Sequence, residues 1–457
     1  MKKSLNHIIQ SLDQILPYTI VGKVLTSRGQ IFETYLPQAT VGSRVLFVTD
    51  SQEEVEGEVV SIKEKRCFCI PYFEITGINN NTKIYLKNLD NKIYLCPELL
   101  GRVVDCSAKP IDHGPNIDNL ADSERSIYSM AINPLDRVTI EDPLYTGIKS
   151  IDSFLTIGKG QRIAIMAGSG VGKSVLMGMI ARNSVASVNV IALIGERGRE
   201  VLDFIKDDLG EEGMKRSVII TSTSDTSPLM RIKAAYTATT IAEYFRDLGH
   251  DVMFMMDSVT RFAMACREVS MSVGEPPGPK GYGPSVFSKL PKLLERMGTK
   301  KGAGSITGIY TVLVEGGDFD EPIVDAIRSI ADGHIVLTRD LASKNFYPAI
   351  DVLQSVSRVM NKVVKREHIV LSSHLRDLMS IYAQSEDLIN LGAYVKGANP
   401  KLDKAVAIKD DIDQFLKQDY QEKSDYESLF DLMVEIARKG ERAINPDLFN
   451  NDENPST

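Results

Sequence analysis

The segment from Arg162 to Arg182 limits the fold of this chain more than any other segment. An apolar run, RIAIM, leads into the glycine-rich stretch AGSGVGKS at residues 167–174, and the apolar stretch VLMGMIAR follows. A strand, a glycine-rich loop and a helix in this order form a phosphate-binding loop, because glycines let backbone N–H groups turn toward phosphate. Ala167 stands at the first position of the usual motif, and a small residue there keeps the mechanism. The sequence therefore predicts an α/β nucleotide-binding domain.

Two side chains of this loop are expected to act on the bound nucleotide. Lys173 would reach the β- and γ-phosphates, which makes it a candidate catalytic residue, and Ser174 would ligate Mg²⁺. The residues predicted to bind the nucleotide are Gly168, Ser169, Gly170, Val171, Gly172, Lys173, Ser174 and Val175.

The remaining sequence divides into regions that differ in the spacing of their apolar residues. Residues 1–18 carry apolar side chains at helical spacing and predict one amphipathic helix. Short β-rich runs over 19–95, separated by Gly and Asn, predict a small β-barrel. Apolar strands alternate with helices over 96–370, which predicts a parallel sheet covered on both faces. Residues 371–457 show only helical patterns, with a tail, NNDENPST, that we expect to be disordered.

Composition excludes several classes of function. The net charge of -8 gives no general attraction to nucleic acid or to anionic lipid. The 5 cysteines and 6 histidines are scattered, without the spacing of a metal site or a disulfide framework. We find no apolar run long enough to span a bilayer and no secretory signal at the start, so we expect a cytoplasmic protein.

Two further strand ends carry candidate site residues. Asp257 follows the apolar run VMFMM and could hold Mg²⁺ beside Ser174, or it could cap the next helix. Glu196 and Arg197 follow the run VNVIALI, where ligand sites of α/β sheets collect. Glu196 could orient the water that attacks the γ-phosphate, or it could form a surface ion pair with Arg199.

Tyr347 and Arg358, in the segment NFYPAIDVLQSVSRVM, are harder to assign. A tyrosine before proline is usually a packed turn residue, but Tyr347 could also stack on adenine. Spacing alone does not place Arg358 against the phosphates. It could be a surface arginine or a cation supplied to a neighbour's site.

Eight sequence blocks, in the same order, resemble the export ATPases of bacterial flagellar type III secretion. These enzymes are relatives of the catalytic subunit of the rotary ATP synthase, and the resemblance covers nearly the whole chain. The blocks are TGIKSIDSFLTIGKGQRIAIMAGSGVGKS, GERGREV, TSDTSPLMR, DSVTRFAMACRE, GEPPGPKGYGPSVFSKLPKLLER, GSITGIYTVLVEG, DGHIVL and YPAIDVLQSVSRVM.

The resemblance implies a RecA-like ATPase core that binds ATP and Mg²⁺ and assembles as a homohexamer. It makes Glu196 the catalytic carboxylate and places Arg197 by the phosphates. It makes Tyr347 the adenine contact and Arg358 the finger that completes a neighbouring subunit's site. Arg261 matches another nucleotide-site arginine of the synthase subunit.

The family also implies partners. These are export-gate and stalk proteins, cargo–chaperone complexes, and a regulator that binds the N-terminal helix. The family works at the inner face of the cytoplasmic membrane with peripheral association, and no specific nucleic acid is expected.

The chain departs from the family pattern at Gly283, Gly317 and Asp320, and near DCSA at residues 105–108. The loop 274–284 would face the central channel of a hexamer. From Lys280 to Lys301 the cations are Lys280, Lys289, Lys292, Arg296, Lys300 and Lys301, against Glu295 alone. This segment is either a solvated surface or a pore lining.

Three other functions compete with flagellar export. An injectisome ATPase shares almost every motif. A ring-shaped RNA or DNA translocase uses the same core but would need a basic, aromatic-rich face on the barrel. A non-catalytic subunit would lack the carboxylate at Glu196.

Overall fold

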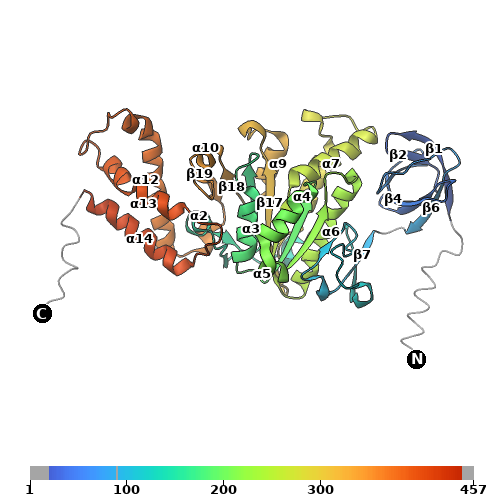
Figure 1. Ribbon diagram of the computed structural model, residues 1–457, viewed down its shortest axis with the longest axis horizontal. Helices are drawn as coiled ribbons and strands as arrows, with labels where there is room; N and C mark the ends of the chain where they lie inside the picture. The colour runs from blue at the N-terminus through green and yellow to red at the C-terminus, as the bar shows by residue number, and fades with distance from the viewer. Residues whose placement is uncertain (1–19, 89–90, 445–457) are drawn as a thin grey trace, which may run out of the picture.

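The computed structural model describes residues 20–88 and 91–444, which form three parts along the long axis of Figure 1. A β-barrel stands at one end, a sheet with helices on both faces fills the middle, and a group of helices forms the other end. This order confirms the predicted fold class. The helix expected at residues 1–18 and the expected disordered tail, NNDENPST, lie outside the described residues, and the region boundaries stay predictions.

The barrel is closed by six strands in the order β1-β2-β5-β4-β3-β6. Alternate side chains such as Val45 and Phe47 are fully buried inside it, as the period of two in a strand requires. Closure leaves no free strand edge. The strands are β1 (Val21–Arg28), β2 (Ile31–Thr34), β3 (Arg44–Val48), β4 (Glu54–Lys63), β5 (Arg66–Pro71) and β6 (Lys83–Asn88).

A connecting segment joins the barrel to the sheet. In it, β7 (Lys92–Leu95) pairs with β9 (Ser123–Ser126), and β10 (Pro143–Leu144) pairs with β11 (Ile157–Gly158). The short strand β8 (Val103–Val104) joins the edge of the central sheet beside β14.

The central sheet has the order β19-β18-β12-β17-β15-β13-β14-β8. Neighbouring strands run parallel, except that β19 is antiparallel to β18 and β16 (Gly298–Thr299) is antiparallel to β17. Because both faces are covered, β13 is buried at every residue, as its continuous apolar run predicts. The main strands are β12 (Arg162–Ala167), β13 (Val188–Ile194), β14 (Ser217–Ser222), β15 (Asp251–Asp257), β17 (Ser305–Leu313), β18 (Gly333–Leu337) and β19 (Ile350–Ser357).

Two sets of helices bury the two faces of this sheet. One face packs against α6 (Pro228–Asp247), α7 (Val259–Ser272), α8 (Pro284–Leu294) and α9 (Pro322–Ile330). The other packs against α2 (Lys149–Phe154), α3 (Lys173–Asn183) and the C-terminal helices. The shorter helices are α4 (Gly198–Asp203), a π-helical turn (Phe204–Leu209), α5 (Gly210–Lys215), α10 (Arg339–Ser343) and α11 (Met360–Val363).

The C-terminal part consists of α12 (Arg366–Asn390), α13 (Pro400–Leu416) and α14 (Tyr426–Arg442). Side chains cap two of them: Asn399 accepts from the N–H groups of Lys401 and Leu402, and Asp425 accepts from that of Ser428. In the described part of the chain, no helix combines the length and the apolar character needed to cross a membrane.

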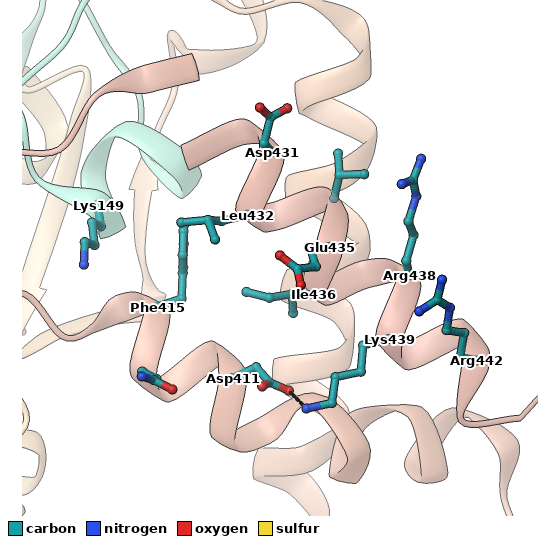
Figure 2. A pocket seen from close by; sticks show the side chains of 12 residues that line it. Lys149, Asp411, Phe415, Asp431, Leu432, Glu435, Ile436, Arg438, Lys439 and Arg442 are labelled. Atoms are coloured by element: carbon teal, nitrogen blue, oxygen red, sulfur yellow. Dashed lines mark ion pairs between the residues drawn. The ribbon is translucent and has the colours of Figure 1, made fainter. Parts of the chain in front are cut away.

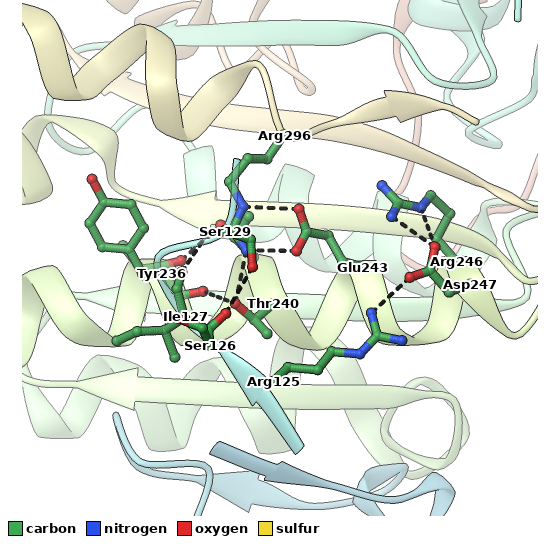
Figure 3. A network of polar contacts seen from close by, with 12 residues as sticks. Arg125, Ser126, Ile127, Ser129, Tyr236, Thr240, Glu243, Arg246, Asp247 and Arg296 are labelled. Carbon is green, nitrogen blue, oxygen red and sulfur yellow. Dashed lines mark hydrogen bonds and ion pairs between the residues drawn. The ribbon is translucent and has the colours of Figure 1, made fainter. Parts of the chain in front are cut away.

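Arg296 is fully buried in a polar network between α6, α8 and the connecting segment (Figure 3). Its Nε and Nη2 donate to the Glu243 carboxylate at 2.9 and 2.6 Å, and Nη2 also donates to Thr240 Oγ1 at 2.9 Å. Its Nη1 donates to the carbonyl of Ile127 at 2.6 Å. Arg296 therefore binds structural elements together and does not belong to an exposed basic surface.

Two other cations of the segment Lys280–Lys301 are also paired. Lys300 Nζ lies 3.3 Å from Asp247, and Lys280 Nζ lies 3.4 Å from Asp318. Within the segment the count of six cations against Glu295 stands, and acidic residues distant in the sequence neutralise part of this charge.

Candidate active site

The phosphate-binding loop lies where the sequence predicts it, between β12 and α3. Gly170 and Gly172 have φ angles of 78° and 87°, a left-handed conformation that favours glycine. Helix α3 begins at Lys173, so the N-terminal end of the helix, with its free N–H groups, follows the loop directly. Ser174 and Val175 are exposed in the first turn. The loop therefore has the geometry of an anion site.

Three candidate residues from three strand ends meet beside this loop. Lys173 Nζ hydrogen-bonds to Asp257 Oδ1 and lies 3.9 Å from Glu196 Oε1. Asp257 is the last residue of β15, and Glu196 follows β13, so parallel strand ends bring both carboxylates to one edge of the sheet. Thr311 Oγ1, from β17, donates to Asp257 Oδ1 at 2.7 Å and fixes that carboxylate.

The carboxyl group of Glu196 is poised to exchange a proton near neutral pH. Burial, together with the negative charge of Asp257, raises its pKa to about 7, and the positive charges of Lys173 and Arg261 oppose that rise. Its Oε1 atom is buried and accepts no hydrogen bond from any residue that the structure describes. A carboxylate with a free, buried oxygen beside a phosphate loop can accept a proton from water.

If Glu196 accepts the proton of the attacking water, as the family resemblance implies, this raised pKa predicts the pH dependence of ATP hydrolysis. Below pH 7 Glu196 is protonated and cannot accept a proton, so kcat/KM for ATP should fall about tenfold per pH unit on the acid side and level off above pH 7. Steady-state rates from pH 5.5 to 9 would measure this limb. In the same series with Glu196→Gln, kcat/KM should not fall on the acid side. A fall that persists in the variant would be caused by another titrating group.

The two arginines near Glu196 lie differently. Arg197 has a side chain 81% exposed, and its Nη1 lies 3.4 Å from Glu200. Arg261, on α7, packs against the turn of Gly195: a Cβ built on that glycine would lie 3.0 Å from the Cβ of Arg261. Of the two, Arg261 is the one whose charge acts on Glu196.

Tyr347 lies beside the phosphate loop. Two of its ring atoms are 3.6 Å from the position that a Cβ on Gly172 would take, and the side chain is 42% exposed. Its carbonyl accepts the backbone N–H of Gln418 at 2.9 Å, which ties it to the C-terminal helical part. An exposed ring next to the loop is free to receive a flat ligand.

Arg358 lies at the opposite edge of the sheet from the loop. In the parallel pair β12–β18, Ala167 faces Leu337, and in the antiparallel pair β18–β19, Gly333 faces Ser357. Arg358 follows Ser357 and its N–H bonds to the carbonyl of Asp332, so five strand steps of about 3.3 Å separate it from the level of Ala167, about 17 Å along the strands. The side chain is exposed.

Sequence reasoning missed three residues at this site: Thr311, Arg339 and Gln418. The Nε of Arg339 lies 3.5 Å from where a Cβ on Gly168 would stand. Gln418 is buried, and its Oε1 accepts the backbone N–H of Lys149 at 2.9 Å. Arg339 had a local signal, because it follows directly on the apolar strand β18. No local sequence signal pointed to Thr311 or Gln418. Their positions depend on the strand order and on the placement of the helices, which local patterns do not determine.

Two of the cavities bear on the position of the site. One of about 360 Å³ adjoins the phosphate loop and is lined by Gly168, Arg339 and the divergent Gly317. A larger one of about 890 Å³ lies between α13 and α14, where Figure 2 shows Phe415 and Ile436 among charged side chains. The larger cavity is thus distant from the residues that carry the chemistry.

Comparison with known proteins identifies the family. Residues 147–357 match the nucleotide-binding domain of the ATP synthase alpha/beta family, and residues 364–435 match the T3SS EscN ATPase C-terminal domain. The flagellum-specific ATP synthase of Borreliella burgdorferi is 45% identical over 95% of this chain and 100% of its own length. That of Bacillus subtilis is 47% identical over 90% of this chain and 94% of its own length.

Solved structures agree with this assignment. The assembled ATPase EscN from the enteropathogenic E. coli type III secretion system has a TM-score of 0.86 at 43% identity, covering 91% of this chain and 100% of its own. The structure of EscN in complex with its central stalk EscO has a TM-score of 0.83. The family predicted from the eight sequence blocks is confirmed. The chain belongs to the ATP synthase alpha/beta family and, within it, to the flagellum-specific ATP synthases, the ATPases of flagellar type III export.

Proposed function

We propose that this ATPase hydrolyses ATP with Lys173 and Glu196 as its central catalytic residues. The observation that carries this assignment is the convergence of Lys173, Glu196 and Asp257 at one sheet edge, 3.9 Å separating Lys173 Nζ from Glu196 Oε1. Lys173 neutralises charge on the β- and γ-phosphates, and Glu196 orients the attacking water and takes its proton. Arg197 lies on the exposed side of the same turn, from which its long side chain reaches the phosphates once nucleotide is bound.

Other residues bind the phosphates and the adenine of the nucleotide. The backbone of Gly168, Ser169, Gly170, Val171 and Gly172, with the first turn of α3 at Ser174 and Val175, receives the phosphates. Tyr347, in contact with Gly172, packs on the adenine.

Mg²⁺ fits the donor set at this edge. Asp257 and Ser174 offer oxygen atoms, which Mg²⁺ prefers, and the phosphates and water complete its shell. Lys173 now occupies Asp257 Oδ1, and bound phosphate would draw the lysine toward itself and leave that oxygen for the metal shell. The ion, when bound, supplies positive charge to the γ-phosphate.

We further propose that the working enzyme is a homohexamer whose sites lie between subunits. Arg358 supports this, because it is exposed and about 17 Å along the strands from its own loop. The relative EscN is described as assembled and as bound to a central stalk, and such a ring would set Arg358 against a neighbour's phosphates.

In the cell, this enzyme would energise protein export at the flagellar base, with stalk and export-gate proteins, cargo–chaperone complexes and a regulator of the N-terminal segment as partners. It would work in the cytoplasm, at the inner face of the membrane. The pairing of Lys280 and Lys300 with acidic residues and the burial of Arg296 argue against an RNA or DNA translocase.

Glu196→Gln tests the catalytic assignment. The variant should bind ATP with unchanged affinity and lower the single-turnover rate by at least about 100-fold, because the amide cannot accept the proton of the attacking water. Glu212→Gln, on α5, where the carboxylate pairs with Lys215, is the matched control and should lose far less. A turnover rate near that of the parent in Glu196→Gln would remove Glu196 from the mechanism.

A further inference from the structure

The side chain of Arg358 is held loosely in the subunit. Its Nη1 donates to the carbonyl of Ala331 at 3.3 Å, and its Nη2 donates to that of Arg328 at 3.4 Å. Both carbonyls stand at the C-terminal end of α9, where the helix dipole favours a cation. Contacts of this length cannot by themselves fix a guanidinium group that has to meet a phosphate.

The backbone of Arg358 is held more firmly, through Asp332. The N–H of Arg358 donates to the carbonyl of Asp332 at 2.9 Å, in the turn between α9 and β18. The carboxylate of Asp332 receives three hydrogen bonds from one residue, Arg162: from its backbone N–H at 3.0 Å, from Nε at 3.0 Å and from Nη2 at 3.1 Å. This fork-shaped pair has side chains only 27% and 15% exposed, so water screens it little.

Arg162 also joins this turn to the helix that carries the loop 274–284. Its Nη1 forms an ion pair with Glu295, the residue that ends α8. Arg162 is, in addition, the first residue of β12, the strand that leads into the phosphate loop. One strand thus carries the subunit's own phosphate loop at one end and the anchor of Arg358 at the other.

We propose that Asp332 and Arg162 are positioning residues for Arg358, setting the place of its backbone so that the guanidinium reaches the neighbour's phosphates. This inference rests on the proposed function of Arg358 across the subunit interface. Neither positioning residue touches nucleotide. Each acts on catalysis in the adjacent site and leaves nucleotide binding in its own site intact.

The test is Asp332→Asn, which keeps the size of the side chain and removes its charge. In the full-length protein, kcat should fall about tenfold while ATP affinity in each subunit stays within about twofold, because the phosphate loop is not disturbed. Asp251→Asn is the matched control. Asp251 starts β15 at the same sheet edge and bonds to Lys159 and Ser305, both at 2.8 Å, with no link to Arg358, so kcat should be retained.

Mixed rings decide on which side of an interface Asp332 acts. Asp332→Asn mixed with Lys173→Ala should gain activity above the sum of the two, because an intact loop can meet an intact finger. Asp332→Asn mixed with Arg358→Ala should gain nothing, because both lesions affect the finger side. The reverse pattern, or a loss of ATP affinity in Asp332→Asn, would overturn the proposal, as would an unchanged kcat.

Two further measurements separate failure of the positioning role from misfolding and from failure of the proposed role of Arg358. Arg162→Lys keeps the charge but not the fork, so it should show the same pattern with a loss of about threefold, and it replaces Asp332→Asn if that variant does not fold. Lys173→Ala mixed with Arg358→Ala, with neither positioning residue changed, tests the finger itself. No gain in that mixture defeats the proposed role of Arg358, whereas a gain there without the Asp332 pattern defeats only the positioning role.

Discussion

Lys173→Ala should lower kcat/KM for ATP by about 1,000-fold or more, a loss of about 4 kcal/mol of transition-state stabilisation. The ammonium group is the protein charge closest to the γ-phosphate in the proposed site. It also balances two carboxylates, since its Nζ bonds to Asp257 and lies 3.9 Å from Glu196 Oε1. Its removal would raise the pKa of Glu196 further, because the charge of Lys173 opposes that rise.

Phosphate release measured over a range of ATP concentrations gives kcat and KM, and so this loss of kcat/KM. Lys301→Ala, which removes an exposed lysine in the segment before β17, is the control and should turn over at the parent's rate. If thermal unfolding shows that the Lys173→Ala protein is folded and it still retains a tenth of the activity, the phosphate contact is contradicted.

Arg358→Ala should lower kcat by about 1,000-fold, the usual size of the effect of an arginine that stabilises the transition-state charge of phosphoryl transfer. ATP affinity of the isolated subunit should not change, because the residue lies about 17 Å along the strands from its own loop. Arg358→Lys should recover only part of the rate, since a point charge replaces a planar fork.

The control for Arg358 is Arg366→Ala, which removes an exposed arginine at the start of α12. It should leave kcat intact. If Arg358→Ala instead weakened ATP binding in isolated subunits and kept kcat, Arg358 would be acting inside its own subunit.

Local patterns predicted the residues that follow directly on apolar strands. Lys173, Glu196 and Asp257 each stand at or just beyond such a strand, and the parallel order of the sheet collects strand ends at one edge. The barrel and the C-terminal helices were predictable for the same reason, because their apolar residues keep a period of two or of about 3.6.

Contacts that depend on strand order could not be predicted in this way. Thr311 reaches Asp257 only because β17 lies beside β15, and Asp332 reaches Arg162 only because β18 lies beside β12. Arg296 belongs to a basic stretch of sequence, yet it is buried against Glu243 from α6, 53 positions away. Whether such a side chain is exposed or buried depends on its pairing with distant segments. The charge pattern of its own segment does not predict that pairing.

The most direct test of the central claim, that each site is completed by Arg358 of a neighbouring subunit, is the ATPase rate of rings mixed from Lys173→Ala and Arg358→Ala proteins. Each parent variant is expected to be nearly inactive alone. In an equal, random mixture about a quarter of the interfaces join an intact Lys173 to an intact Arg358, so activity should rise far above that of either variant. Mixed rings, verified by sedimentation, that stay as inactive as their parents would contradict the claim.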